Sequence, residues 1–128
     1  MTVSEIPNSG TERWPEEIEY NSAEKSLRIV FDNGEVFSLP AEYLRVESPS
    51  AEVQGHAAEE RKTVPGRRHV GIIGIDPVGN YAIKINFDDL HDTGIYSWTY
   101  LYQLGKDKDQ IWSDYLADLE RLGLSRDP

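Results

Sequence analysis

His91 is the residue whose neighbours are most typical of a metal-binding site. It lies in the run Asp88-Asp89-Leu90-His91-Asp92, where carboxylate oxygens and an imidazole nitrogen are dense. Such oxygen and nitrogen donors hold hard or borderline metal ions. The predicted ligand set comprises His91, His56, Glu47 and Glu52. The alternative interpretation is an acidic turn at the end of a strand, because no second histidine stands near His91 at ligand spacing.

Four cations follow residue 60 and locally reverse the acidic charge of the chain. They are Arg61, Lys62, Arg67 and Arg68. Guanidinium and ammonium groups bind carboxylates and phosphates, so this basic run is the predicted partner-binding site. The alternative is a solvated loop whose charge is balanced by Glu59 and Glu60.

No catalytic residue is predicted from the sequence. The serines lack a nucleophile signature such as Gly-x-Ser-x-Gly. The stretch 71–74 has glycine at both ends, as some phosphate-binding loops do, but it stands between two expected strands. Phosphate loops join a strand to a helix, so a turn with a bulge is expected here instead.

Alternating apolar and polar residues predict a strand-rich first two-thirds of the chain. The expected strands lie near residues 18–20, 27–31, 36–39, 70–75, 81–87 and 94–96. Asp32-Asn33-Gly34-Glu35 predicts a hairpin with a type I′ turn. Residues 76–80 predict a second turn, and Pro40 suits the first position of a short helix over 41–46.

Two helices are predicted at the C-terminal end. Ser97 is the expected N-cap of a helix over 98–104, and Gly105 its expected stop. The last helix begins at residue 107 or 109 and ends at Gly123. Its apolar face is formed by Ile111, Trp112, Tyr115, Leu116, Leu119 and Leu122.

The segment 47–67 shows no convincing period. A structureless loop of about 20 residues is uncommon within a domain and is often functional, so the functional site is expected in this region. The complete pattern predicts an α+β fold, with an antiparallel sheet and two C-terminal helices packed on one face. One domain is expected over residues 14–123, between a flexible tail at 1–13 and a second tail at 124–128.

Composition narrows the classes of function further. The chain has 128 residues and a formal net charge of −10, which disfavours nucleic acid and anionic membranes as partners. It has no cysteine, so disulfides, thiolate catalysis and cysteine-ligated clusters are excluded for this chain alone. No membrane-spanning run or secretory signal is evident. A cytoplasmic protein with a protein partner is expected, and its oligomeric state is left open.

Two stretches, residues 44–56 and 78–98, resemble the gamma-butyrobetaine hydroxylase-like N-terminal domain family, and the chain looks like a small stand-alone bacterial member. The resemblance extends over about residues 16–105. In eukaryotic hydroxylases of this family the domain precedes an iron- and 2-oxoglutarate-dependent oxygenase domain. Plant iron–sulfur scaffold proteins of the P-loop type carry a similar domain at their C-terminus. This chain has no room for the oxygenase barrel, so hydroxylase activity is not expected.

The resemblance also implies a zinc site made of three cysteines and a histidine. By position the cysteines fall at Ser48, Ser50 and Val53, and the histidine falls at His91. Because only the histidine is kept, the family's zinc site is expected to be absent, while iron or another metal stays open. Bacterial members usually have glycine before this histidine, whereas this chain has Leu90.

Three functions remain open on the sequence. The favoured one is a non-catalytic binding or adaptor module, with a connection to iron–sulfur or metal handling. The second is a metal-binding protein that uses oxygen and nitrogen ligands around His91. The third is a small stand-alone enzyme, which would need a pocket in which His91 approaches an acid such as Asp88.

Overall fold

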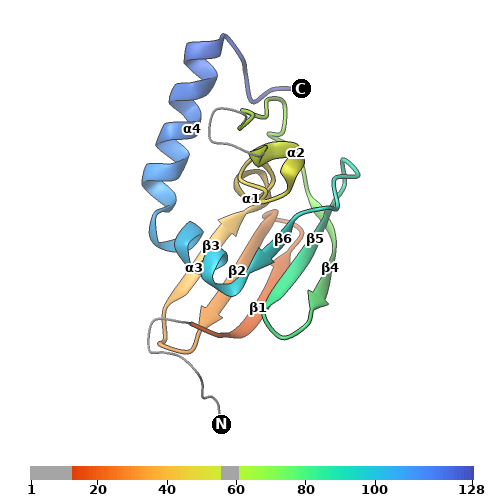
Figure 1. Cartoon of the computed structure of the whole chain (residues 1–128), viewed down its shortest axis with the longest axis vertical. Coiled ribbons are helices and arrows are strands. Elements are labelled where there is room, and N and C mark those ends of the chain that lie inside the picture. The colour runs from red at the N-terminus through yellow and green to blue at the C-terminus, as the bar shows by residue number, and fades with distance from the viewer. Residues whose placement is uncertain (1–12, 56–60) are drawn as a thin grey trace.

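Two antiparallel sheets of three strands each form the β-part of the computed structural model, which describes residues 13–55 and 61–128 (Figure 1). The first sheet has the order β1-β2-β3, with β1 (Pro15–Asn21), β2 (Ser26–Phe31) and β3 (Val36–Pro40). The second has the order β4-β5-β6, with β4 (Ile72–Val78), β5 (Ala82–Phe87) and β6 (Ile95–Ser97). The predicted α+β class is confirmed, and the strands are divided between two sheets.

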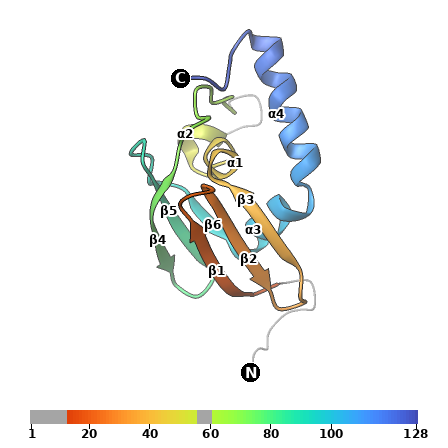
Figure 2. The ribbon, with the colours of Figure 1, turned by 180° about the vertical axis from the view of Figure 1, so that it is seen from behind.

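Four helices accompany the strands. They are α1 (Ala41–Val46), α2 (Ala51–Gln54), α3 (Trp98–Lys106) and α4 (Lys108–Leu122). Figures 1 and 2 show α3 on one side of the strands, while α4 continues past α1 and α2. In residues 13–55 and 61–128, no helix combines the length and the apolar character needed to cross a bilayer.

One hydrophobic core joins both sheets to the helices. Side chains at alternate positions of a strand share a face, and both central strands direct an apolar face inward. The core residues are Leu27, Ile29 and Phe31 on β2, Ile83, Ile85 and Phe87 on β5, and Leu44, Leu101 and Leu104 on the helices. The strict alternation of the two strands is therefore what positions α1 and α3 over the sheets.

The turn between β2 and β3 differs from the type I′ prediction. Gly34 has a φ of 86°, and neither Asp32 nor Asn33 has a positive φ. The Gly34 N–H donates to the Phe31 carbonyl at 2.9 Å, and the Phe31 N–H donates to the Glu35 carbonyl at 2.9 Å. These bonds describe a type I turn followed by a left-handed glycine that forms a bulge. The predicted hairpin is present, but the turn type was wrong.

β4 extends through Val78, so only Gly79 and Asn80 of the turn predicted at 76–80 lie in the observed turn, which continues to Tyr81. The register of β4 against β5 shifts between Ile72 and Gly74. This irregularity is the bulge expected in the glycine-flanked stretch 71–74. The stretch joins strand to strand, as the sequence interpretation expected.

The segment 47–67 contains the short helix α2, which the sequence did not predict. Val53 is its one buried residue, and its carbonyl accepts a bond from the Lys62 N–H at 2.7 Å. A helix of four residues buries too few side chains to show a period. The loop prediction is therefore wrong for residues 51–54.

Gly105 lies inside α3 and does not end it, contrary to the prediction. A Cβ on Gly105 would lie 2.4 Å from ring carbons of Phe37 on β3, so the glycine permits a close approach of helix and strand. The other end of α3 matches the prediction, because the Ser97 hydroxyl accepts a bond from the Tyr100 N–H at 3.1 Å.

We expect Gly105→Ala to lower the free energy of unfolding by about 2 kcal/mol, because overpacking against Phe37 outweighs the gain in helix propensity of about 1 kcal/mol. Urea denaturation followed by tryptophan fluorescence measures the change. Ser113→Ala, on the exposed face of α4, is the control and should leave stability within about 0.5 kcal/mol. A more stable Gly105→Ala protein would show that the helix can move away from the ring.

The C-terminal residues 124–128, which the sequence analysis described as a tail, are hydrogen-bonded to the segment 66–68. The Gly66 N–H donates to the Ser125 carbonyl at 2.9 Å, and the Arg68 N–H donates to the Arg126 carbonyl at 3.0 Å. The Arg68 side chain also lies 2.5 Å from an Asp127 oxygen. Of the other predicted tail, residues 1–13, only residue 13 lies within the described part of the chain.

Candidate functional site

α1 is a buried helix that carries charge, and this arrangement organises the candidate site. All six residues of α1 are buried, among them Glu42 and Arg45, and Glu47 at its C-cap is buried as well. Each charge is neutralised by a segment distant in the sequence. The pairs are Glu42–Arg126, Arg45–Asp89 and Glu47–Arg61, with closest nitrogen–oxygen distances of 2.7, 2.8 and 2.5 Å. Buried charges require such partners.

His91 lies against the segment that follows α1. Its Nε2 is 2.9 Å from the Ser48 hydroxyl and 3.3 Å from the Ser50 hydroxyl. Its Nδ1 is 3.5 Å from a Glu52 oxygen. Burial lowers the pKa of His91, and the charge of Arg45 lowers it further, against the opposing effect of Glu52 and other acids. The ring is therefore neutral at neutral pH and serves as a hydrogen-bonding group.

Two of the positions to which the resemblance assigned zinc ligands do meet His91, but as serines. Serine hydroxyls are not typical zinc ligands and Val53 offers no donor atom, so the residues present do not fit the zinc site of the family. Both serine hydroxyls are hydrogen-bonded to Nε2 of His91.

The predicted metal set is only partly brought together. His91 and Glu52 are neighbours, whereas Glu47 is paired with Arg61 and His56 lies outside the described residues. Within residues 13–55 and 61–128, no group of three histidine or acidic residues is arranged to hold a metal ion. A metal site around His91 stays a prediction.

Leu90 adopts the backbone conformation that glycine favours. Its φ is 72° and the residue is 83% exposed. The leucine therefore adopts the strained left-handed backbone conformation, and no burial of its side chain offsets the cost. Left-handed geometry costs an ordinary residue about 1 kcal/mol or more. This geometry explains why a glycine suits the position before the histidine.

We therefore expect Leu90→Gly to leave stability unchanged or to raise it by up to about 1 kcal/mol, although glycine usually destabilises by increasing the entropy of the unfolded chain. Thermal and urea denaturation test this. Leu116→Gly, at an exposed position in the interior of α4, is the control and should lower stability by about 1 kcal/mol. Equal losses in both variants would contradict the strain at Leu90.

The cations of the predicted partner-binding run separate in the fold. Arg61 pairs with Glu47, Arg67 lies 2.7 Å from Asp89, and Arg68 pairs with Asp127. The run thus ties its own segment to three parts of the molecule. Lys62 is exposed, and within the described chain its ammonium group makes no hydrogen bond or ion pair.

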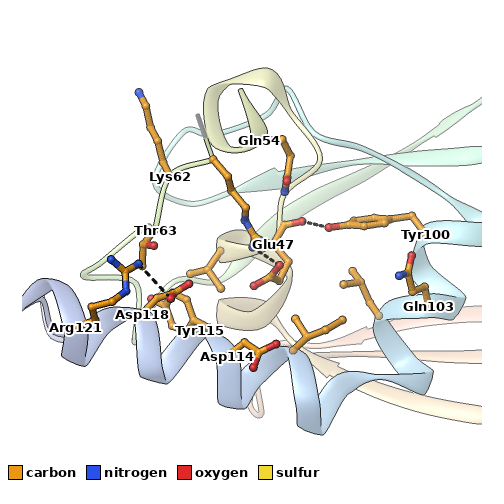
Figure 3. A pocket seen from close by; sticks show the side chains of 14 residues that line it. Glu47, Gln54, Lys62, Thr63, Tyr100, Gln103, Asp114, Tyr115, Asp118 and Arg121 are labelled. Carbon is orange, nitrogen blue, oxygen red and sulfur yellow. Dashed lines mark hydrogen bonds and ion pairs between the residues drawn. The ribbon is translucent and has the colours of Figure 1, made fainter. Parts of the chain in front are cut away.

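A cavity of about 560 Å³ opens between the segment 61–63 and α4 (Figure 3), and we call it the α4 cleft. Its apolar lining is Val46, Leu104 and Ile111; its polar lining is Glu47, Gln54, Arg61, Lys62, Thr63, Tyr100, Gln103, Asp114, Tyr115, Asp118 and Arg121. The volume lies within the range of ligand sites. A cleft with a mainly polar and charged lining suits a polar segment of another molecule.

Glu47 is the central charge of the α4 cleft. Burial raises the pKa of its carboxyl; the Arg61 guanidinium opposes that rise, and the charges of Asp118 and Asp114 add to it. The Tyr100 hydroxyl donates to the Glu47 carbonyl at 2.5 Å, and burial raises the pKa of Tyr100 to about 12. The cleft therefore places a poorly solvated carboxylate beside a neutral phenol.

Sequence reasoning missed the α4 wall of this cleft. Asp114 and Asp118 are one helical turn apart, beside the apolar face formed by Tyr115 and Leu119. Their spacing is visible in the sequence, but any surface helix shows such pairs. Only the proximity of α1 and the segment 61–63 makes the pair part of a site.

Solved structures and sequence families place the chain among relatives. Two NMR solution structures are similar to it, each with a TM-score of 0.80. The first is 48% identical, and the match covers 91% of this chain and 92% of that chain. The second is 44% identical, and the match covers 98% of this chain and 92% of that chain. The crystal structure of a protein of unknown function in the DUF971 family, from Acidithiobacillus ferrooxidans, is 34% identical, covers 71% and 91%, and has a TM-score of 0.61. The family profile described as gamma-butyrobetaine hydroxylase-like, N-terminal, matches residues 18–102. No curated protein sequence matches the chain.

Proposed function

The chain belongs to the gamma-butyrobetaine hydroxylase-like N-terminal domain family, and from that premise we propose that it is a non-catalytic binding or adaptor module. Its docking site is the α4 cleft. The observation that carries the proposal is the combination of an accessible cavity with a charged rim and polar groups that lack internal partners.

Those unpartnered groups are Lys62 on one wall and Gln103 on the other. Neither side chain makes a hydrogen bond or ion pair inside the described chain. A primary ammonium and a carboxamide bind the carbonyls, amides and carboxylates of a polypeptide. Val46 and Leu104 are buried, so the partly exposed Ile111 offers the apolar contact area for an aliphatic or aromatic anchor. Central anchors with a polar rim are typical of protein interfaces.

The arrangement nearest to a catalytic one is the chain of contacts from Ser48 through His91 to Glu52. It has the residue types of a nucleophile, a base and an acid. However, Ser48 has no exposed surface, so its hydroxyl has no access to a substrate. This contrast with the open cleft favours binding over catalysis.

Site-specific photo-crosslinking tests the proposal in the living source cell. A benzophenone amino acid at Gln103 should capture a discrete partner, whereas the same group at Glu19, on the opposite sheet face, should not. Removal of the ammonium donor by Lys62→Ala should weaken the adduct while the protein stays folded. Capture at both positions, or at neither, would contradict docking in the α4 cleft.

A second candidate is metal binding at His91, in support of iron–sulfur or metal handling. The observation in its favour is that Ser48, Ser50 and Glu52 place oxygens within 3.5 Å of the two ring nitrogens. Elemental analysis of untagged protein tests it, with His91→Ala as the matched variant. Substoichiometric metal that is equal in both proteins would remove this candidate.

A further inference from the structure

The α4 cleft already holds an arginine of the chain itself. The Glu47 side chain is 5% exposed, and its Oε1 lies 2.5 Å from Nη2 of Arg61. Arg61 is 44% exposed, so its guanidinium reaches the carboxylate from the solvent side. A carboxylate this buried needs a cation, and the cation present is the one that a competing arginine could replace.

Two further acids of the cleft increase the need for a cation beside Glu47. Asp114 and Asp118 line the same cleft as Glu47, and their charges add a smaller contribution to the rise in its pKa that burial causes. Of the other cations of the lining, Arg121 is paired with Asp118 at 3.3 Å. Lys62 extends away from Glu47 in Figure 3. Once Arg61 leaves, the base of the cleft has uncompensated negative charge.

Resting on the proposed docking role of the cleft, we infer that the recognition element of the partner is an arginine side chain. It binds Glu47, backed by Asp114 and Asp118, and Arg61 fills this position until the partner displaces it. A guanidinium suits the position better than an ammonium because it is planar, weakly hydrated and able to form two parallel bonds to a carboxylate. The net charge of −10 attracts such a basic partner over a longer range.

Arg61 therefore acts as an internal competitor. The apparent affinity for a partner arginine equals the intrinsic affinity multiplied by the fraction of molecules in which Arg61 has left the carboxylate. If that fraction is about one-tenth, removing the Arg61 side chain should tighten binding about ten-fold. A gain of binding cannot arise from misfolding, so this variant is the most informative one.

The experiment is an NMR titration of the full chain at pH 8, because a higher pH favours the ionised form of the Glu47 carboxyl, whose pKa burial raises. The probe is a capped tetrapeptide with one arginine, compared with its lysine and citrulline counterparts. The arginine peptide should shift the amide signals of Tyr100, Gln103 and Asp114. Arg61→Ala should tighten binding about ten-fold, and Asp114→Asn with Asp118→Asn should weaken it several-fold. Arg28→Ala, an exposed arginine on the first sheet, should bind as the unaltered chain does.

Equal binding of the three peptides, or unchanged affinity in Arg61→Ala, would overturn the inference. The crosslinking at Gln103 distinguishes a failure of arginine recognition from a failure of the proposed docking role. If Gln103 still crosslinks a partner that the arginine peptide cannot displace, the cleft docks the partner without arginine recognition. If Gln103 captures nothing, the docking role itself is wrong.

Discussion

Arg126→Ala is expected to lower the free energy of unfolding by about 3 kcal/mol, and the midpoint of thermal unfolding by roughly 10 °C. The Arg126 guanidinium donates to both oxygens of Glu42, at 2.7 and 2.8 Å, and Glu42 is only 8% exposed. Cζ of Arg126 also lies 5.2 Å from the centre of the Trp112 ring. Loss of the arginine leaves a carboxylate buried without its partner, which is the costly way to break an ion pair.

A double-mutant cycle separates this cause from simple loss of packing. Glu42→Gln removes the charge that needs neutralising, so Arg126→Ala should cost much less in that background. The control is Arg121→Ala, whose pair with Asp118 is exposed on both sides and should change stability by less than 1 kcal/mol. Urea denaturation of the four proteins and the control gives the coupling.

Deletion of residues 124–128 should reproduce the effect of Arg126→Ala, since it removes the same guanidinium and the backbone bonds to residues 66 and 68. A truncated protein as stable as the complete chain would mean that Glu42 is neutralised in another way.

Elements with a strong local period could be predicted from the sequence. β2 and β5 alternate strictly, and α4 shows its apolar face at helical spacing. Each of these elements is specified by the residues within it, so neighbouring positions suffice to recognise it. Gly105 was misread because its role is set by Phe37, which lies on another element.

The candidate site could not be predicted in the same way, because the residues that form its ion pairs are far apart in the sequence. Glu42 and Arg126 are 84 positions apart, and Arg45 and Asp89 are 44 apart. Three charges within residues 42–47 would ordinarily indicate a solvated helix face. They are buried here because later segments supply the counter-charges. The Ser48–His91 contact could be anticipated only through the resemblance to a family.

Asp89→Ala is expected to lower the free energy of unfolding by about 3 to 5 kcal/mol, which is more than the loss expected for Arg126→Ala. One Asp89 oxygen lies 2.8 Å from Nε of Arg45 and 2.7 Å from Nε of Arg67. The other accepts a bond from the His91 N–H at 3.1 Å. Without the carboxylate, two guanidinium groups repel each other around a partly buried position, and the His91 N–H loses its acceptor.

The pH dependence of this contribution follows from the pKa of Asp89. Burial alone would raise this pKa, but the bond from the His91 N–H, the bond from Arg45 and the charges of Arg45 and Arg67 lower it below its ordinary value of 3.8. The unfolded chain therefore binds a proton more readily than the folded chain. The stabilisation is complete above about pH 4 to 5 and is lost as the pH falls through the lower pKa of the folded state.

Asp89→Asn isolates this charge effect because it keeps the size of the side chain. The difference in unfolding free energy between the original chain and Asp89→Asn should be constant from pH 7 to about pH 5 and should shrink below about pH 4. Asp92→Asn, an exposed acid of the same turn, is the control and should show a small difference throughout. A difference that grows toward low pH would require Asp89 to be protonated in the folded state first. The carboxylate would then be a cost that the two arginines fail to offset, and the ion pairs of α1 would no longer explain how the helix tolerates burial.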